Sequence, residues 1–229
     1  MSFQNVLIDT PDGFRLPALF VPCAQGQGRP LVLIQEIFGI NSAMRTAAQD
    51  WAAQGFDVLC PDLFARQQSN VSLDPREPGQ FQAGVQLMMG MKPELALQDL
   101  ESARQWLAHR QPGQGVAALG YCLGGRLAVQ MALHTPVAAA VSYYGVGLEE
   151  LLPETPQPIA PTLLHIAEND AFVPAPARET ILARAAALKG VEAHVYPGCD
   201  HAFARPDGEH HDAGATAQAL KRTLAFLHA

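Results

Sequence analysis

The sequence of 229 residues has few cysteines and no long apolar run, and each shortage excludes a class of protein. Its four cysteines, at positions 23, 60, 122 and 199, form no CxxC pair and no spacing typical of a secreted disulfide framework. No apolar segment approaches the roughly 20 residues that cross a bilayer. The first residues show no basic region followed by an apolar one, so no secretory signal is visible. We therefore expect a cytoplasmic protein with free thiols and no membrane contact.

The sequence also lacks a basic run and internal repeats. Its 15 Lys and Arg stand against 22 Asp and Glu, which leaves a net charge of −7. This balance argues against a nucleic-acid partner. The hydrophobic fraction of 48% is that of a globular chain. Because no low-complexity linker divides the sequence, we expect one domain over residues 1–229, and nothing in it demands more than a monomer.

Short apolar runs alternate with helical patterns along the chain. We expect strands at residues 14–22, 30–36, 56–63, 115–121, 137–145, 161–170 and 192–198. We expect helices at residues 42–55, 93–110, 124–135, 174–190 and 212–229, the first capped by Ser42. Such alternation indicates an α/β fold with a mostly parallel sheet flanked by helices on both faces. No helix separates the first two strands, which allows an antiparallel edge.

Four side chains suited to hydrolytic chemistry follow four of the predicted strands, in the order Glu36, Cys122, Asp170 and His201. In open parallel sheets the ligand site lies beyond the carboxyl ends of the strands. One polar residue in such a place is expected by chance. Four together predict an active site at that edge of the sheet.

Cys122 stands in the stretch "LGYCLGG", between a predicted strand and a predicted helix. Flanking glycines allow a sharp, strained turn that exposes a nucleophile at the top of the sheet. The helix N-terminus would stabilise a thiolate there. The N–H groups of Leu123 and Ile37 would form the oxyanion hole. The alternative is a cysteine that only packs in the core.

The other three residues have roles that depend on Cys122. His201 would act as base and acid, and Asp170 would orient its ring and stabilise the imidazolium. The alternatives are a turn or cap residue for Asp170 and an ordinary loop histidine for His201. Glu36 is costly to bury unless it is paired. It would accept, or compete for, the thiol proton of Cys122, and its alternative is a surface glutamate.

A metal site is the remaining possibility among these residues. Cys199 lies two residues before His201, and His210 and His211 follow. No CxxC or HExxH spacing completes a ligand set. We therefore expect neither a metal ion nor a cofactor.

Several stretches together resemble the dienelactone hydrolase family of the α/β-hydrolase superfamily. They are "QEIFGIN" (35–41), "CPDLF" (60–64), "GYCLGG" (120–125), "SYYGVGLE" (142–149), "ENDAFVPAP" (168–176) and "GCDHAFAR" (198–205). The resemblance covers most of the chain and implies the α/β-hydrolase fold. It also implies a Cys-His-Asp hydrolase of strained or activated lactones and esters, which forms a thioester that water then cleaves. In the family, the glutamate that matches Glu36 pairs with the thiol at rest until substrate disturbs the pair.

The resemblance extends to the substrate pocket. Arg205 matches an arginine that holds a substrate carboxylate, and Tyr144 matches a pocket tyrosine. Phe81 stands where the family's best-known members have a second arginine, and Met88 where they have a tryptophan. Arg76 could supply the missing cation after a register shift. These departures concern substrate specificity more than chemistry.

Three functions remain open at this point. The leading hypothesis is a cofactor-free cysteine hydrolase of small lactones or activated esters. The second is a general carboxylesterase or thioesterase with an unrelated substrate. The third is an idle scaffold that binds a ligand or senses oxidants through Cys122.

The polar residues 65–80 are expected to form a surface loop beside the pocket, as a wall or a lid.

Overall fold

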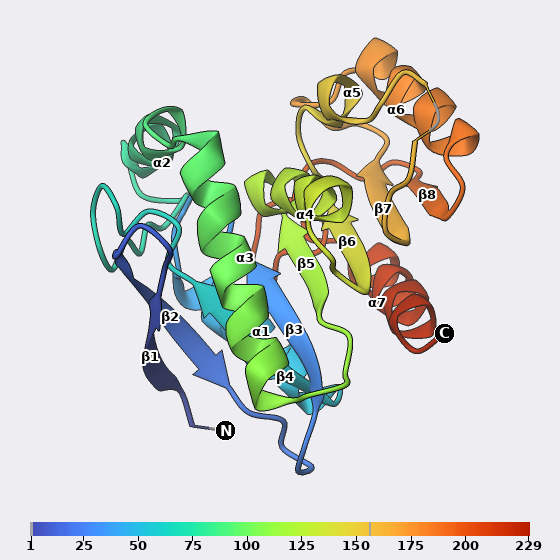
Figure 1. The fold of residues 1–229 in the computed structure, drawn as a ribbon. Coiled ribbons are helices and arrows are strands. Elements are labelled where there is room, and N and C mark those ends of the chain that lie inside the picture. Colours follow the sequence, from blue (N-terminus) through green and yellow to red (C-terminus); the bar gives the residue numbers. More distant parts are fainter. Residues whose placement is uncertain (1, 156) are drawn as a thin grey trace. The chain divides into compact units, whose positions relative to one another are not determined.

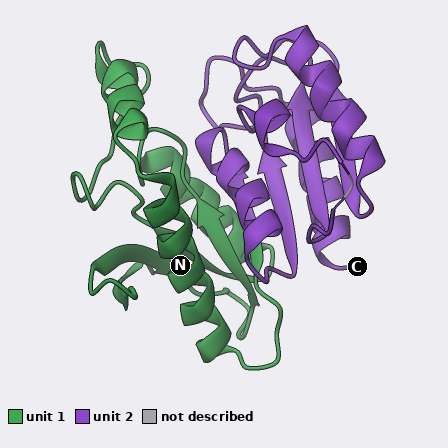
Figure 2. Ribbon diagram, turned by 45° about the horizontal axis from the view of Figure 1, so that its top comes forward, with its two compact units in different colours: residues 1–117 green, residues 118–229 purple. Residues whose placement is uncertain are grey.

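The computed structural model describes residues 2–155 and 157–229. The chain divides into two compact units, residues 1–117 and 118–229, which Figure 2 shows in different colours. Each unit is described by itself here. The expectation of one domain over residues 1–229 stays a prediction.

The first unit contains four strands in the spatial order β1-β2-β4-β3 (Figure 1). They are β1 (Gln4–Asp9), β2 (Arg15–Val21), β3 (Arg29–Ile34) and β4 (Phe56–Pro61). Strand β2 runs antiparallel to β1 and β4, whereas β3 and β4 are parallel. The antiparallel edge is therefore present. The sequence did not predict β1, because its apolar run is only three residues long and Leu7 within it is 50% exposed.

The first unit also contains the helices α1 (Ser42–Ala53), α2 (Gln80–Met89) and α3 (Pro93–Arg110). The prediction for α3 is confirmed at both ends. The prediction that Ser42 caps α1 is wrong, because Ser42 is the first helical residue. Asn41 is the cap, and its side chain accepts a hydrogen bond of 3.1 Å from the N–H of Met44.

Helix α2 was not predicted from the sequence. It begins after Gly79, carries Gly84 in its middle and has no side-chain cap at its start, so helix signals are weak. Gly84 is its buried residue, and a Cβ atom there would lie 2.5 Å from the carbonyl oxygen of Ile37. The glycine therefore lets α2 approach the backbone at Ile37. The polar segment before α2 is joined to the same region by a bridge between Gly39 and Ser72.

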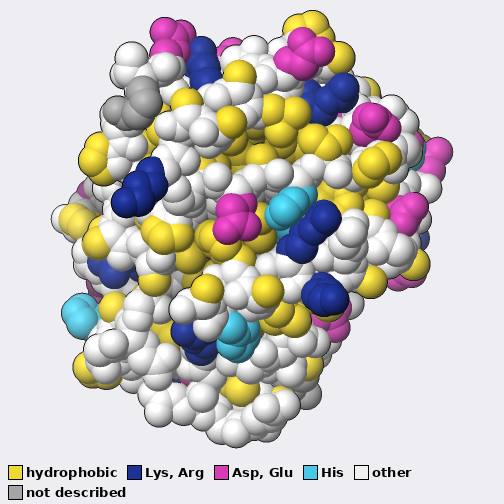
Figure 3. All heavy atoms as spheres, turned by 90° about the vertical axis from the view of Figure 1, so that its right-hand side faces the viewer, with side chains coloured by type: hydrophobic (Ala, Val, Ile, Leu, Met, Phe, Trp, Pro, Cys, Tyr) yellow, Lys and Arg dark blue, Asp and Glu magenta, His cyan; other side chains and the backbone are white. Residues whose placement is uncertain are grey.

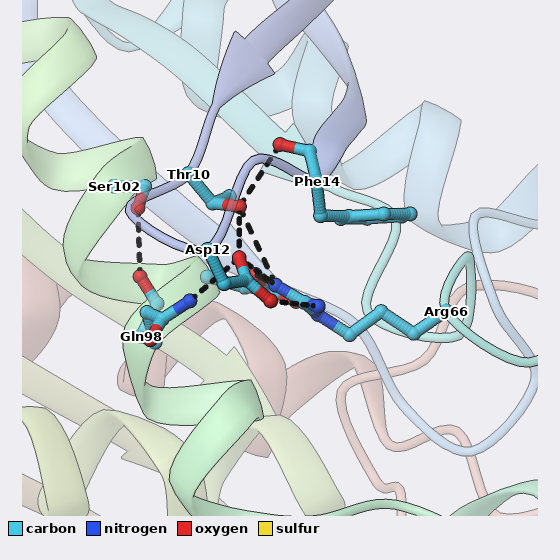
Figure 4. Close-up of polar contacts among 7 residues, drawn as sticks. Thr10, Asp12, Phe14, Arg66, Gln98 and Ser102 are labelled. Atoms are coloured by element: carbon cyan, nitrogen blue, oxygen red, sulfur yellow. Dashed lines mark hydrogen bonds and ion pairs between the residues drawn. The ribbon is translucent and has the colours of Figure 1, made fainter.

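A charged cluster joins the β1–β2 turn to α3 (Figure 4). Arg66 donates to Asp12 at 2.7 and 3.0 Å and to the buried Asp99 through two hydrogen bonds of 2.8 Å. Its guanidinium also lies 4.4 Å from the ring centre of Phe14. The hydrogen bond from Arg66 holds the pKa of Asp12 below its ordinary value. One cation thus satisfies two carboxylates that are far apart in sequence.

The second unit contains β5 (Ala117–Tyr121), which begins at the boundary, followed by β6 (Ala139–Tyr143), β7 (Thr162–Ala167) and β8 (Val191–Tyr196). Their spatial order is β5-β6-β7-β8, and β6, β7 and β8 pair in parallel. The helices are α4 (Leu123–His134), α5 (Leu148–Leu151), α6 (Ala175–Ala187) and α7 (Ala213–Leu227). All but the four-residue α5 were predicted, with ends that differ by a few residues.

Helices pack onto this parallel group through an apolar cluster. Val129 of α4, Leu164 of β7 and Ile181 of α6 are fully buried in it, together with Val173 from the loop after β7. Each such side chain contributes about 1.5–3 kcal/mol by leaving water. The cluster therefore fixes the loop that carries Asp170 and Phe172.

A buried polar network joins α7 to three strands. The imidazole of His165 in β7 contacts the hydroxyl of Tyr196 and that of Thr223, each at 2.8 Å. The hydroxyl of Tyr143 also lies 2.8 Å from that of Thr223. Burial is the main cause that lowers the pKa of His165 to about 3. His165 is therefore neutral at physiological pH and acts as a structural link.

The surface carries charges of both signs. On the face drawn in Figure 3, acidic and basic side chains are interspersed among apolar and uncharged atoms. Within residues 2–155 and 157–229, none of the helices combines the length and the apolar character needed to cross a membrane.

Candidate active site

Cys122 occupies a strained turn between β5 and α4. Its φ and ψ angles are 54° and −114°, a region that residues with a side chain rarely adopt. Its N–H donates to the carbonyl of Tyr143 at 3.0 Å, and its own carbonyl accepts from the N–H of Arg126 at 3.2 Å. The Cys122 side chain remains partly exposed. The sharp strand-to-helix turn expected from "LGYCLGG" is present.

The glycines around Cys122 are required by close backbone approaches. A Cβ atom at Gly120 would lie 2.1 Å from the carbonyl oxygen of Gly124, in the first turn of α4. A Cβ atom at Gly125 would lie 2.7 Å from the hydroxyl of Ser142 and 2.9 Å from the Cα atom of Gly145. Side chains at either position would push α4 away from β5 and β6. The glycines therefore hold the N-terminus of α4 directly behind Cys122.

His201 interacts with Asp170 and with Cys122. Its Nδ1 atom donates a hydrogen bond of 2.7 Å to Oδ2 of Asp170, and the Cys122 side chain is near enough to influence the pKa of the ring. His201 is 9% exposed and Asp170 is 4% exposed. Burial acts to lower the pKa of His201, but the hydrogen bond with Asp170 and the interaction with the Cys122 side chain outweigh it and raise the pKa to about 10. The surroundings of His201 thus favour the imidazolium form.

Asp170 also has the turn role that was considered as its alternative. Its Oδ1 atom accepts a hydrogen bond of 2.9 Å from the N–H of Phe172, and its carbonyl accepts one of 3.1 Å from the N–H of Val173. One carboxylate therefore shapes the loop with one oxygen and contacts His201 with the other. The two interpretations of Asp170 are compatible.

Aromatic rings surround His201. The Tyr144 ring centre lies 5.1 Å from that of His201, and the Phe172 ring centre lies 4.8 Å away, both edge to face. Tyr144 has a φ of 40° and donates its N–H to the carbonyl of His165 at 2.8 Å. Tyr144 is 2% exposed, so the predicted pocket residue is also a buried aromatic. Sequence reasoning missed Phe172, although it stands only two residues after Asp170.

The remaining predicted residues of the second unit flank the site. Leu123 is the first residue of α4 and directly follows Cys122. Its N–H is therefore one of the first N–H groups of a helix, which have no hydrogen-bond partner within the helix. Arg205 follows His201 in a turn in which its N–H donates to the carbonyl of Ala202 at 2.9 Å. Ala202 has a φ of 64°, so the backbone bends sharply after His201. Both predicted roles stay predictions.

Four predicted site residues belong to the first unit. Glu36 follows β3 and is 2% exposed, so its alternative as a surface glutamate is wrong. Ile37 is buried in the same loop. Phe81 and Met88 lie on α2, where the Phe81 ring centre is 6.3 Å from that of Phe38. Their relation to Cys122 and His201 stays a prediction.

Arg76 was considered as a replacement for the missing substrate arginine. Its guanidinium forms hydrogen bonds of 2.7–3.2 Å with the carboxylate of Asp74. This exposed ion pair partly neutralises Arg76.

Cys199 and His210 occupy other environments. Cys199 is buried, and burial raises the pKa of its thiol. His210 lies 3.8 Å from Asp200 at the surface. Among the described residues, no three His, Cys, Asp or Glu side chains form a group that could hold a metal ion.

Comparison with known proteins identifies the family of this chain. The sequence model of the dienelactone hydrolase family matches residues 17–229. The chain belongs to the dienelactone hydrolase family. The resemblance seen in its motifs is thereby confirmed, and the chain is a hydrolase of the dienelactone hydrolase type.

Relatives of this family member match it over nearly its full length. It is 37% identical to a carboxymethylenebutenolidase of Pseudomonas putida, over 99% of this chain and 97% of the relative. It is 42% identical to a protein of Azospirillum brasilense named as a candidate carboxymethylenebutenolidase, over 90% of this chain and 89% of the relative. A crystal structure of a candidate dienelactone hydrolase from Klebsiella pneumoniae is 25% identical, with a TM-score of 0.79 over 99% of this chain and 98% of that one. The predicted α/β-hydrolase fold is confirmed.

Proposed function

We propose that this hydrolase cleaves small lactones or activated esters with Cys122 as nucleophile, His201 as base and acid, and Asp170 as the residue that orients His201. The single observation that carries the proposal is that His201 is hydrogen-bonded to Asp170 at 2.7 Å and also interacts with the Cys122 side chain. This chain of three groups is the arrangement that activates a nucleophile. The strained backbone at Cys122 gives further support, because such turns present nucleophiles in this fold.

The reaction would proceed in two halves. In the first, the Cys122 thiolate attacks the carbonyl carbon, the carbon–oxygen bond of the ester breaks, and His201 gives its proton to the leaving oxygen. In the second, His201 accepts a proton from water, the hydroxide attacks the thioester, and Cys122 leaves as a thiolate. N–H groups of Leu123 and Ile37 would stabilise the oxyanion in both halves.

The substrate class follows from the chemistry of sulfur. A thiolate is a better leaving group than most alkoxides, so the tetrahedral intermediate collapses forward only when the substrate oxygen also leaves readily. Enol esters, lactones with enol leaving groups and aryl esters meet this condition, whereas amides do not. We therefore propose a small, soluble molecule with such a bond as the substrate. Arg205 would bind a substrate carboxylate.

The experiment is a comparison of wild type, Cys122→Ala and Cys122→Ser on cis- and trans-dienelactones, aryl acetates and acyl thioesters. Cys122→Ala should lose at least about 1,000-fold in kcat/KM. Cys23→Ser is the matched control, because Cys23 is also partly exposed and belongs to the other unit. Mass spectrometry of acid-quenched wild type should find the acyl group on the Cys122 peptide. Full activity of Cys122→Ala on every substrate would overturn the nucleophile assignment.

A further inference from the structure

Phe172 combines solvent exposure with a fixed backbone. It is 52% exposed, and in residues 118–155 and 157–229 it is the only large apolar side chain that stays exposed. Its N–H donates to Asp170 Oδ1 at 2.9 Å, and the next residue, Val173, is buried in the apolar cluster. The loop therefore holds an aromatic ring partly in water. The ring does not contribute the hydrophobic free energy that full burial would give.

The position of this ring relates it to one half of the reaction. Its centre lies 4.8 Å from that of His201, with an angle of 76° between the rings. The Cys122 side chain interacts with His201 closely enough to help raise the pKa of its ring. In the proposed mechanism His201 protonates the leaving oxygen. The leaving group must therefore sit beside His201, and hence beside Phe172.

We infer that Phe172 is a specificity-determining residue that contacts the leaving-group side of the substrate and favours flat, unsaturated leaving groups. This inference rests on the proposed function. Exposed aromatic rings gain most from flat partners, because two π systems attract beyond the area that they bury. A dienelactone or an aryl ester has such a flat leaving group, whereas a saturated alkyl ester does not. Asp170 thus positions the base and the specificity residue through one carboxylate.

The test compares phenyl acetate with hexafluoroisopropyl acetate. Their leaving groups have similar acidity, but only the phenolate is flat and aromatic. Phe172→Leu should lower kcat/KM for phenyl acetate about threefold to tenfold relative to hexafluoroisopropyl acetate, and Phe172→Tyr should restore the ratio. Phe3→Leu is the matched control, because Phe3 is also an exposed phenylalanine but belongs to the first unit.

Any result other than a selective loss on phenyl acetate that Phe172→Tyr restores would overturn the inference. An equal loss for both esters, with a shifted pH profile of kcat/KM, would mean that Phe172 only positions His201. An unchanged ratio at unchanged rates would mean that Phe172 contacts neither leaving group. Failure of the proposed function would look different, since Cys122→Ala would then remain active. Thermal unfolding of Phe172→Leu separates these effects from misfolding.

Discussion

The Nδ1 atom of His201 lies 2.7 Å from Oδ2 of Asp170, a hydrogen bond between two buried side chains. The residues are 31 positions apart and follow different strands, β8 and β7. Since parallel strands end at the same edge of a sheet, these two loops meet there. The bond leaves the other nitrogen of His201 available to Cys122, which is the arrangement on which most of the following predictions depend.

Asp170→Asn should lower kcat/KM by at least about 100-fold, because an amide stabilises neither the imidazolium nor the required tautomer. The measurement is steady-state hydrolysis of an aryl ester, with circular dichroism to verify folding. Asp200→Asn is the control, since Asp200 precedes His201 in sequence but contacts His210 at the surface. Wild-type activity in Asp170→Asn would remove Asp170 from the mechanism.

Glu36→Ala should change the rate and the pH profile with which iodoacetamide alkylates Cys122. The physical reason is that Glu36 is predicted to pair with the thiol at rest, and a buried carboxyl group in that place would compete for the thiol proton. Mass spectrometry of the Cys122 peptide distinguishes this thiol from Cys23, which is also partly exposed. Glu94→Ala, at the exposed start of α3, is the control. An identical profile in Glu36→Ala would show that Glu36 does not act on the thiol.

Arg205→Ala should raise KM selectively for anionic substrates, because a guanidinium recognises a carboxylate through charge-assisted hydrogen bonds. The measurement is the ratio of KM values for a carboxylate-bearing lactone and a neutral aryl ester. Arg184→Ala is the control, since Arg184 is bound to Glu154 and to backbone carbonyls near α5. Equal effects on both substrates would mean that Arg205 does not bind the substrate carboxylate.

Gly120→Ala should destabilise the fold by about 1–3 kcal/mol or more, because the new methyl group would overlap the backbone of Gly124. A flexible side chain could move aside, but the first turn of α4 cannot do so without displacing Cys122. The free energy of unfolding in urea measures the effect. Gly214→Ala, whose nearest atom is a side-chain oxygen at 3.4 Å, is the control and should be close to neutral.

His165→Asn should reduce the loss of stability in acid. The folded chain holds His165 at a pKa of about 3 against an ordinary value of 6.5, so only the unfolded chain takes up this proton between those pH values. The free energy of unfolding therefore decreases as the pH is lowered through this window, by about 1.4 kcal/mol per pH unit for one group. His201 does not contribute there, since its raised pKa keeps it protonated in the folded chain below 6.5.

Urea unfolding at several pH values within that window measures the slope. His211→Asn, at an exposed position, is the control and should keep the wild-type slope. The same slope in His165→Asn as in wild type would contradict the prediction.

Local signals were sufficient for most elements. Pro93 at the first turn and apolar residues at helical spacing predict α3 at its observed bounds. The elements that were missed have weak local signals. Helix α2 contains Gly84, which costs helix propensity, and is stabilised by a close approach to Ile37 that no local pattern reveals. Strand β1 is stabilised by pairing with β2 at an exposed edge.

The sequence by itself determined the class of fold, the family and the candidates Cys122, Asp170 and His201, because strand periodicity and glycine spacing are local properties. Only the tertiary structure decided that His201 is hydrogen-bonded to Asp170 and interacts with Cys122, and that the exposed Phe172 ring lies against His201. The reason is that these contacts join loops after β5, β7 and β8. Their distances depend on how the strands pair and how the helices pack, which a linear pattern does not contain.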